Sequence, residues 1–362
     1  MQRHSATIGN KPRLQWIDAA KGIGIILVIL IHSEIWNCCK STESPLFSDL
    51  ARFIGIAAIP IMPLFYILSG YTFKEQPSVM KQRLKRLISP YALWGCIALS
   101  ILTITSGKNA DLSDFLLHSA GLIYSRFSFL PPENGATITL FPNGAEPLWF
   151  LTSLVSSYAC FLVLIRFPQF RNLIIISYII TTALLTFLPI LLPWSIDTAP
   201  AGALFLYAGY MMKKLNIFQL RKLWLLLSAL LLLPVYQILI SYNGEINMSI
   251  RLFGKHTFLS PCLFLFIGIT GSYLYCLLCI FLVKCKLAHA LTYIGRISLT
   301  ILCSHMLVLS YTGRIVGKIA YTLNIPPPSG QFLFVWQLVT ALLFAIILTE
   351  ACRFGSRLLQ TR

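Results

Sequence analysis

Charged residues are scarce in this chain. Only 11% of its 362 residues are charged, whereas soluble globular proteins carry about 25%. Because 57% of the residues are hydrophobic, too few polar side chains remain to give a core of that size a water-soluble surface. The composition therefore excludes a soluble globular fold and indicates an integral membrane protein.

The apolar segments also lack the alternation of polar and apolar residues that is typical of membrane-spanning strands. They are continuous runs of about 20 residues, the length at which a helix crosses a hydrocarbon core roughly 30 Å thick. We predict an all-α integral membrane protein, a bundle of about ten transmembrane helices that makes residues 1–362 one membrane-embedded domain. The expected spans are residues 17–36, 51–73, 88–106, 147–166, 172–192, 199–212, 223–241, 257–283, 290–311 and 331–352.

Acidic residues are few, 12 against 29 lysines and arginines. The basic residues lie in short runs between apolar segments rather than on a soluble segment with aromatic residues, so we expect no nucleic-acid partner. Cytoplasmic loops are enriched in Lys and Arg, and most of them fall inside if the N-terminus is inside. We therefore predict that both termini are cytoplasmic, with residues 1–16 as a cytoplasmic tail. Residues 107–146 then form the one large outer-face loop, and Arg126 and Arg251 count among the outer charges.

The ten cysteines do not predict a redox or metal-binding framework. Cys276 and Cys279 have the spacing of a redox pair, but they lie within an apolar span, where a thiol behaves as a small hydrophobic group. We expect no bound metal. The first apolar run is as long as a span and no small-residue cleavage site follows it, so we expect no cleaved signal peptide. From the arrangement of the spans along the chain, we also expect no appended soluble domain.

Polar side chains within apolar segments are rare, which makes each of them a candidate functional residue. The first span carries Asp18, Lys21, His32 and Glu34. Lys21 and His32 are eleven positions apart, within about 20° of whole helical turns, so they share one face roughly 16 Å apart. The plain alternative is that Lys21 is an orientation anchor and His32 a bundle histidine with satisfied hydrogen bonds.

Four stretches of the sequence, in order, resemble the acyltransferase-3 family of integral membrane acyltransferases. They are Asp18-x-x-Lys21-Gly22 with His32, Met62-Pro-Leu-Phe-Tyr-Ile-Leu-Ser-Gly-Tyr71, Arg83-Leu-Lys-Arg86 before Ile88-Ser-Pro-Tyr91, and Gly295-Arg-Ile-Ser298 through His305. The resemblance covers almost the whole chain. Two features depart from it: the family commonly has Arg at the position of Lys21, and the large outer-face domain of some members is lacking.

The resemblance implies transfer of an acyl group, usually acetyl, from cytosolic acyl-coenzyme A to a hydroxyl of a cell-surface glycan or glycolipid, in a bacterial inner membrane. The donor is a substrate, and no permanently bound cofactor is expected. Attack of a sugar hydroxyl on a thioester needs a base, and an imidazole with an ordinary pKa of about 6.5 suits this at neutral pH. We predict His32 as the general base, oriented by Asp18 or Glu34.

Arg83 and Arg86 are one helical turn apart and can face a single ligand. They suit the phosphates of coenzyme A, which arginine binds through charge-assisted hydrogen bonds, and Lys21 is predicted to assist them. The alternative is that these arginines only orient the chain in the membrane.

Three further residues lie towards the predicted outer face. His305 is expected at a depth comparable to that of His32, where a catalytic or acceptor-positioning role and a packed core histidine both stay open. Glu146 and Trp149 are candidate acceptor-binding residues at the outer mouth. Their alternatives are a solvated loop end and an interfacial aromatic residue.

The alternative function is that of a transporter or flippase for a lipid-linked sugar. Such a protein would need charged or broken helices in paired positions near the membrane midplane. An enzyme of the membrane-bound O-acyltransferase kind would carry its marked histidine in a late span, whereas here the first span carries it.

Overall fold

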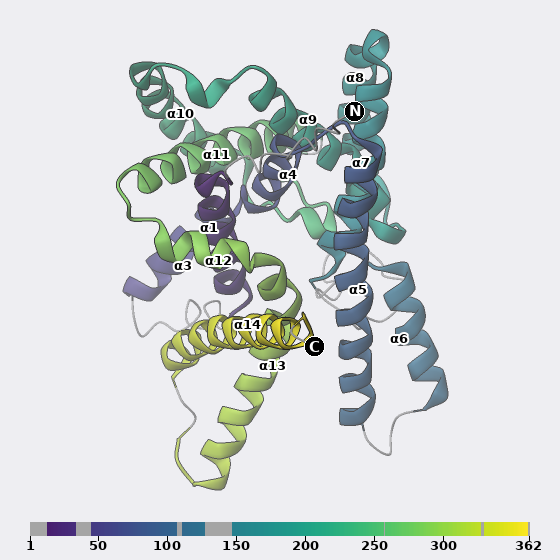
Figure 1. The fold of residues 1–362 in the computed structure, drawn as a ribbon, viewed down its shortest axis with the longest axis vertical. Helices are drawn as coiled ribbons and strands as arrows, with labels where there is room; N and C mark the ends of the chain where they lie inside the picture. The colour runs from purple at the N-terminus through teal and green to yellow at the C-terminus, as the bar shows by residue number, and fades with distance from the viewer. Residues whose placement is uncertain are drawn as a thin grey trace, which may run out of the picture.

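The computed structural model describes residues 13–33, 45–106, 111–126, 147–256, 258–326 and 329–360 (Figure 1). These residues form α-helices and short 3-10 helices, with isolated bridge residues in place of strands, among them Asn247 paired with Leu252. Nine helices within these ranges are long and apolar enough to cross a membrane. The predicted all-α membrane bundle is therefore confirmed.

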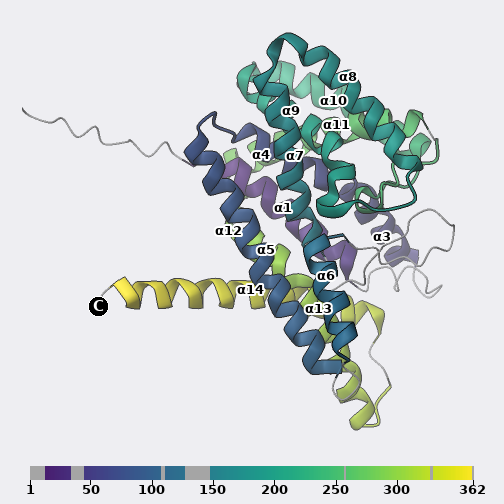
Figure 2. The ribbon, with the colours of Figure 1, turned by 90° about the vertical axis from the view of Figure 1, so that its right-hand side faces the viewer.

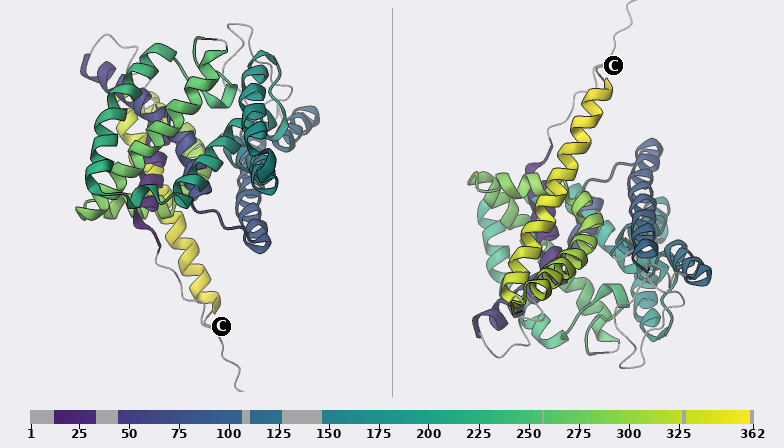
Figure 3. Two further views of the ribbon diagram at one scale, coloured as in Figure 1. Left: turned by 90° about the horizontal axis from the view of Figure 1, so that it is seen from above. Right: turned by 90° about the horizontal axis from the view of Figure 1, so that it is seen from below.

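The first helix lies in the middle of this bundle. α1 (Gln15–His32) contacts α4 (Ile61–Tyr71), α11 (Leu259–Lys284), α12 (His289–Arg296) and α13 (Ser298–Thr322) (Figures 1 and 3). In the apolar segment of α1, 56% of the residues are buried inside the protein. In that of α10 (Lys222–Asn243), only 11% are buried. The polar residues of α1 are thus held inside protein, whereas α10 exposes most of its apolar surface.

A second layer forms around α9 (Ala199–Lys214), which packs against α4 and α7 (Trp149–Arg166). This helix corresponds to the sixth predicted span, and most of its residues are buried. Its 16 residues extend about 24 Å, less than the roughly 30 Å of a hydrocarbon core. With the nine longer helices, it accounts for the ten predicted segments.

The remaining helices flank these layers. They are α3 (Pro45–Ala58), α5 (Pro77–Ser106), α6 (Leu112–Tyr124), α8 (Arg171–Leu184) and α14 (Gly330–Gln360). α5 and α6 lie side by side, and α13 and α14 form a second pair (Figures 1 and 2).

The span predicted at 51–73 is confirmed as the segment Ser48–Tyr71, but its helix is broken between α3 and α4, because Pro60 has no amide hydrogen and disfavours helical geometry at the residue before it. Two other predicted boundaries are wrong. The span predicted at 290–311 is divided at Ile297 into α12 and α13. α5 begins at Pro77, eleven residues before the predicted start, because a helix backbone continues through basic side chains that hydropathy treats as an end.

Close backbone contact between α1 and α12 depends on two glycines. A Cβ on Gly22 would lie 2.1 Å from the carbonyl oxygen of Leu291, and one on Gly295 would lie 1.7 Å from that of Asp18. Any side chain at either position would push the helices apart. The motif that contains Gly22 and the motif that contains Gly295 therefore share a role in packing α1 against α12.

A buried ion cluster joins three other segments. Oδ2 of Asp197 lies 3.2 Å from Nη2 of Arg126 and 3.2 Å from Nε of Arg251, and all three side chains are buried. Arg251 also donates to the carbonyl of Leu185, and the Arg126 guanidinium lies 5.5 Å from the Trp149 ring. The sequence counts Arg126 and Arg251 among the outer charges, and the structure adds that both side chains are buried and paired with Asp197.

Candidate active site

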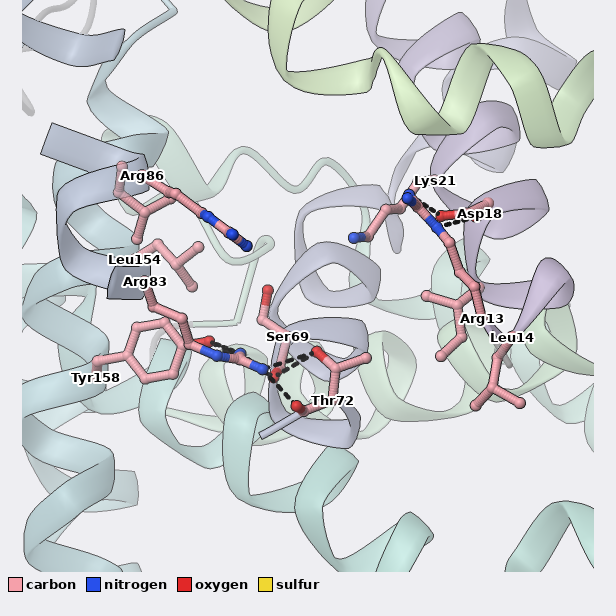
Figure 4. Close-up of a pocket in the computed structure, with 12 residues that line it drawn as sticks. Arg13, Leu14, Asp18, Lys21, Ser69, Thr72, Arg83, Arg86, Leu154 and Tyr158 are labelled. Carbon is pink, nitrogen blue, oxygen red and sulfur yellow. Dashed lines mark hydrogen bonds and ion pairs between the residues drawn. The ribbon is translucent and has the colours of Figure 1, made fainter. Parts of the chain in front are cut away.

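A pocket of about 480 Å³ opens between α1, α4, α5 and α7 (Figure 4). Four of the side chains that line it are cationic, namely Arg13, Lys21, Arg83 and Arg86, and one is acidic, Asp18. The fold thus brings together the three residues that the sequence analysis assigns to donor binding and adds Arg13. Such an excess of positive charge favours an anionic ligand.

The two arginines of α5 have different surroundings. Nη1 of Arg83 donates to the carbonyl of Ser69 at 3.1 Å and to the hydroxyl of Tyr158 at 2.9 Å, and Nη2 donates to the carbonyl of Thr72. Arg86 is exposed and makes no hydrogen bond or ion pair to the part of the chain that the structure describes. Arg83 is therefore bound to protein, and Arg86 is available to a ligand.

Lys21 reaches into the pocket from the opposite side. In Figure 4 its side chain and that of Arg86 point towards each other across the space. Among the described residues Lys21 has no carboxylate within ion-pair distance, although Asp18 is on the same helix. Two cationic groups that face each other, neither of them in ion-pair contact with a carboxylate among the described residues, form a favourable position for an anion.

Asp18, which lines the pocket, forms ion pairs with two arginines. Its Oδ2 and Oδ1 accept hydrogen bonds from Nε and Nη2 of Arg13 at 2.6 and 2.8 Å, and Nε of Arg296 lies 3.7 Å from Oδ2. The hydrogen bond to Asp18 raises the pKa of Arg13 above its ordinary value. Asp18 lies fourteen residues from His32, about 21 Å along α1. It does not contact that histidine, so it cannot orient the imidazole directly.

His32 is the last residue of α1, at the opposite end of the helix from the pocket. Its Nδ1 lies 2.8 Å from the carbonyl oxygen of Val28. A carbonyl oxygen only accepts, so Nδ1 carries the hydrogen and Nε2 of the neutral ring keeps its lone pair. The backbone of its own helix therefore sets the tautomer that a general base needs, with no carboxylate required for that purpose.

His305 on α13 meets His32 inside the bundle. The ring centroids are 5.3 Å apart, with 66° between the ring planes. His305 is fully buried, and its Nδ1 lies 3.0 Å from the carbonyl oxygens of Ile301 and Leu302. Its Nε2 is buried without a hydrogen-bond partner in the described ranges. Two imidazoles thus present Nε2 lone pairs in one region of the bundle.

The structure adds little to the roles predicted for the remaining site residues. Glu34 and Glu146 lie outside the described residues. Trp149 is only 7% exposed and lies over Arg126 within the buried ion cluster. Its ring is therefore neither an interfacial anchor nor an open platform for a sugar in this structure. The sequence did not indicate that Arg13 and Arg296 pair with Asp18. Arg13 precedes the first predicted span, and Arg296 lies in the ninth, far from Asp18 in the sequence.

The fold and the site together define a class of protein. A multi-pass helical bundle carries a cationic pocket at one end of its central helix and a histidine pair at the other. This arrangement is that of an integral membrane protein whose polar site is built from several helices.

Comparison with known protein families specifies the class further. A family model described as an acyltransferase domain matches residues 14–351. The chain therefore belongs to this acyltransferase-3 family and is a membrane acyltransferase. No curated protein and no solved structure matches it.

Proposed function

We propose that this acyltransferase moves an acetyl or similar acyl group from acyl-coenzyme A to a hydroxyl of a cell-surface glycan or lipid-linked glycan, with His32 as the general base. The observation that carries the proposal is that Lys21 and His32 lie on one unbroken helix, one at the cationic pocket and the other at the histidine pair. Family membership favours this reading over the transporter alternative.

The donor suits the pocket because its negative charge and its reactive group are far apart. The phosphates of coenzyme A lie at the nucleotide end, and the thioester lies at the end of the pantetheine arm. Phosphates near Lys21 and Arg86 gain charge-assisted hydrogen bonds. The roughly 16 Å from Lys21 to His32 along α1 is of the order of the length of that arm. The donor therefore spans the site with its phosphates at the pocket.

The chemistry uses the lone pair on Nε2 of His32. Nε2 takes the proton of the acceptor hydroxyl as the oxygen attacks the thioester carbonyl carbon, so that a carbon–oxygen bond forms. The carbon–sulfur bond then breaks, and the leaving thiolate takes the proton from the imidazolium. His32 returns to its starting state, and the products are the acylated glycan and free coenzyme A.

His305 suits the same reaction as an acceptor-positioning residue. Its buried Nε2 has a lone pair and no donor in the described structure, and an unsatisfied buried polar atom is costly. A sugar offers hydroxyls on adjacent carbons, so one hydroxyl can face His32 while its neighbour donates to His305. This geometry favours a polyhydroxyl acceptor over an isolated alcohol.

The opposed ends of the site match opposed substrates. With the N-terminus inside, as the distribution of basic residues indicates, the pocket faces the cytosol, where acyl-coenzyme A is found. The glycan then enters from the outer face of the inner membrane. The acyl group crosses the bundle, while the highly charged carrier stays on the cytosolic side.

An assay on the purified full chain tests the proposal. Isotopically labelled acetyl-coenzyme A is supplied with membrane glycolipid, and label in the glycan and release of free coenzyme A are measured. Both are expected in equal amounts. Movement of the lipid-linked sugar across vesicles without release of coenzyme A would support the transporter instead and overturn the proposed function.

A further inference from the structure

The first arginine of the Arg83-Leu-Lys-Arg86 stretch is held by the protein on several sides. Its two terminal nitrogens have four hydrogens between them. These face the carbonyl of Ser69 and the hydroxyl of Tyr158 from Nη1, and the carbonyl and hydroxyl of Thr72 from Nη2. The guanidinium carbon also lies 5.9 Å from the centroid of the Phe73 ring. Only the Nε hydrogen is left for a ligand.

Three of the four groups that Arg83 binds, the carbonyls of Ser69 and Thr72 and the hydroxyl of Thr72, belong to the end of α4. The last carbonyls of a helix have no partner within that helix, and they carry the negative end of its dipole. Ser69 and Thr72 line the pocket, so these carbonyls would repel an anion placed there. By covering them, Arg83 removes a negative surface from the pocket and fixes the position of the helix end.

Lys21 and Arg86 differ from Arg83 in this respect. Neither makes a hydrogen bond or an ion pair with residues in the described ranges, and Figure 4 shows them reaching across the pocket from α1 and α5. No carboxylate in the described ranges lies within ion-pair distance of either charge, so each can bind an anionic ligand. The next basic residue of α5, Lys85, is exposed and does not line the pocket, which makes it a matched control.

We propose that Lys21 and Arg86 are the phosphate-binding residues of the pocket and that Arg83 is a positioning residue. Arg83 holds the end of α4 and Tyr158 in place without binding phosphate itself. The inference rests on the proposed use of acyl-coenzyme A. It assigns different roles to two arginines that the sequence presents as equivalent. At position 86, ligand binding requires a positive charge. At position 83, it requires a side chain that can form all the hydrogen bonds of the arginine.

Conservative substitutions separate these requirements. The dissociation constant of coenzyme A is measured by calorimetry on the purified full chain in nanodiscs. Arg86→Ala is expected to weaken binding tenfold or more, and Arg86→Lys less than threefold, because lysine keeps the charge. Arg83→Lys is expected to weaken binding as much as Arg83→Ala, about tenfold, because a single ammonium cannot bind the same four groups. Lys85→Ala should leave the constant unchanged.

A double-mutant cycle covers the case in which Arg83 variants fold poorly. Tyr158→Phe removes one partner of Arg83 and leaves the ring in place. It is expected to weaken coenzyme A binding about threefold in the wild-type background and to have no further effect alongside Arg83→Lys, because it acts through the arginine. Equal losses in both backgrounds would mean that Tyr158 contacts the ligand itself and would overturn the positioning role.

The outcomes distinguish the two proposals. If the unmodified chain does not bind coenzyme A, the proposed function fails, and this inference fails with it. If the unmodified chain binds coenzyme A but Arg83→Lys restores binding as fully as Arg86→Lys, the proposed function stands and the division of roles is wrong.

Discussion

The imidazole rings of His32 and His305 meet edge to face with their centroids 5.3 Å apart, although they come from the first helix and from α13. In each ring the Nδ1 hydrogen is directed to a backbone carbonyl of its own helix. Both Nε2 atoms therefore keep lone pairs, and the pair can accept two hydrogen bonds from one substrate.

Removal of the proposed base should abolish turnover without unfolding the protein. His32→Ala is expected to lower the rate of acetyl transfer about 10²–10⁴-fold, the usual contribution of general-base catalysis. The rate is measured with labelled acetyl-coenzyme A, and thermal unfolding in detergent serves as the control. Near-normal turnover by a folded variant would exclude His32 as the base.

Substitution of the second histidine should act on the acceptor. His305→Leu is expected to raise the KM for the glycan about tenfold with little change in the KM for the donor, because a hydrogen bond to the sugar is lost. His305→Gln keeps an acceptor atom near the position of Nε2 and should restore most of the affinity. A rise in donor KM instead would place His305 on the donor side of the site.

The buried ion cluster, whose residues do not line the pocket, predicts a large effect on stability. Asp197→Asn leaves the buried Arg126 and Arg251 without the carboxylate that joins them. We expect the free energy of unfolding to fall by about 3–5 kcal/mol, as it does when one partner of a buried pair is removed. Asp114→Asn, at an exposed position of α6, is the control and should cost less than about 1 kcal/mol.

The contact between α1 and α12 gives a test with an internal control. Gly295→Ala places a methyl group 1.7 Å from the Asp18 carbonyl oxygen, so the helices must separate. We expect at least about 1–3 kcal/mol of destabilisation. The Cβ of Gly317→Ala meets no atom within 4 Å in the described structure and should stabilise α13 by up to about 1 kcal/mol. Equal melting temperatures for the two variants would show that the contact is not tight in the folded protein.

The opposed entrances are tested in sealed vesicles of known orientation. Labelled acetyl-coenzyme A is offered to one face while the acceptor is trapped on the other. We expect transfer only when the donor meets the face that carries Arg83 and Arg86, because the phosphates cannot cross. Equal transfer with donor and acceptor confined to that same face would show that both enter from inside, and the opposed arrangement would have to be abandoned.

The sequence by itself determined the class of the protein and most of its helices. Long apolar runs require helices in a bilayer, because every backbone polar group must be satisfied within the span. The shared face of Lys21 and His32 and the one-turn spacing of Arg83 and Arg86 follow from the helical repeat, which depends only on local spacing. The gathering of Lys21 with Arg83 and Arg86 at one pocket involves two helices, so local spacing could not predict it, and it was expected only through the family resemblance.

Only the tertiary structure decided which side chains meet across helices. The pairing of His32 with His305, the capture of Asp18 by Arg13 and the burial of Arg126 with Asp197 depend on how each helix is rotated against its neighbours. That rotation is set by packing details such as the contact at Gly295, not by hydropathy or periodicity. The different surroundings of Arg83 and Arg86 have the same origin, because only the folded chain places the end of α4 beside one of them.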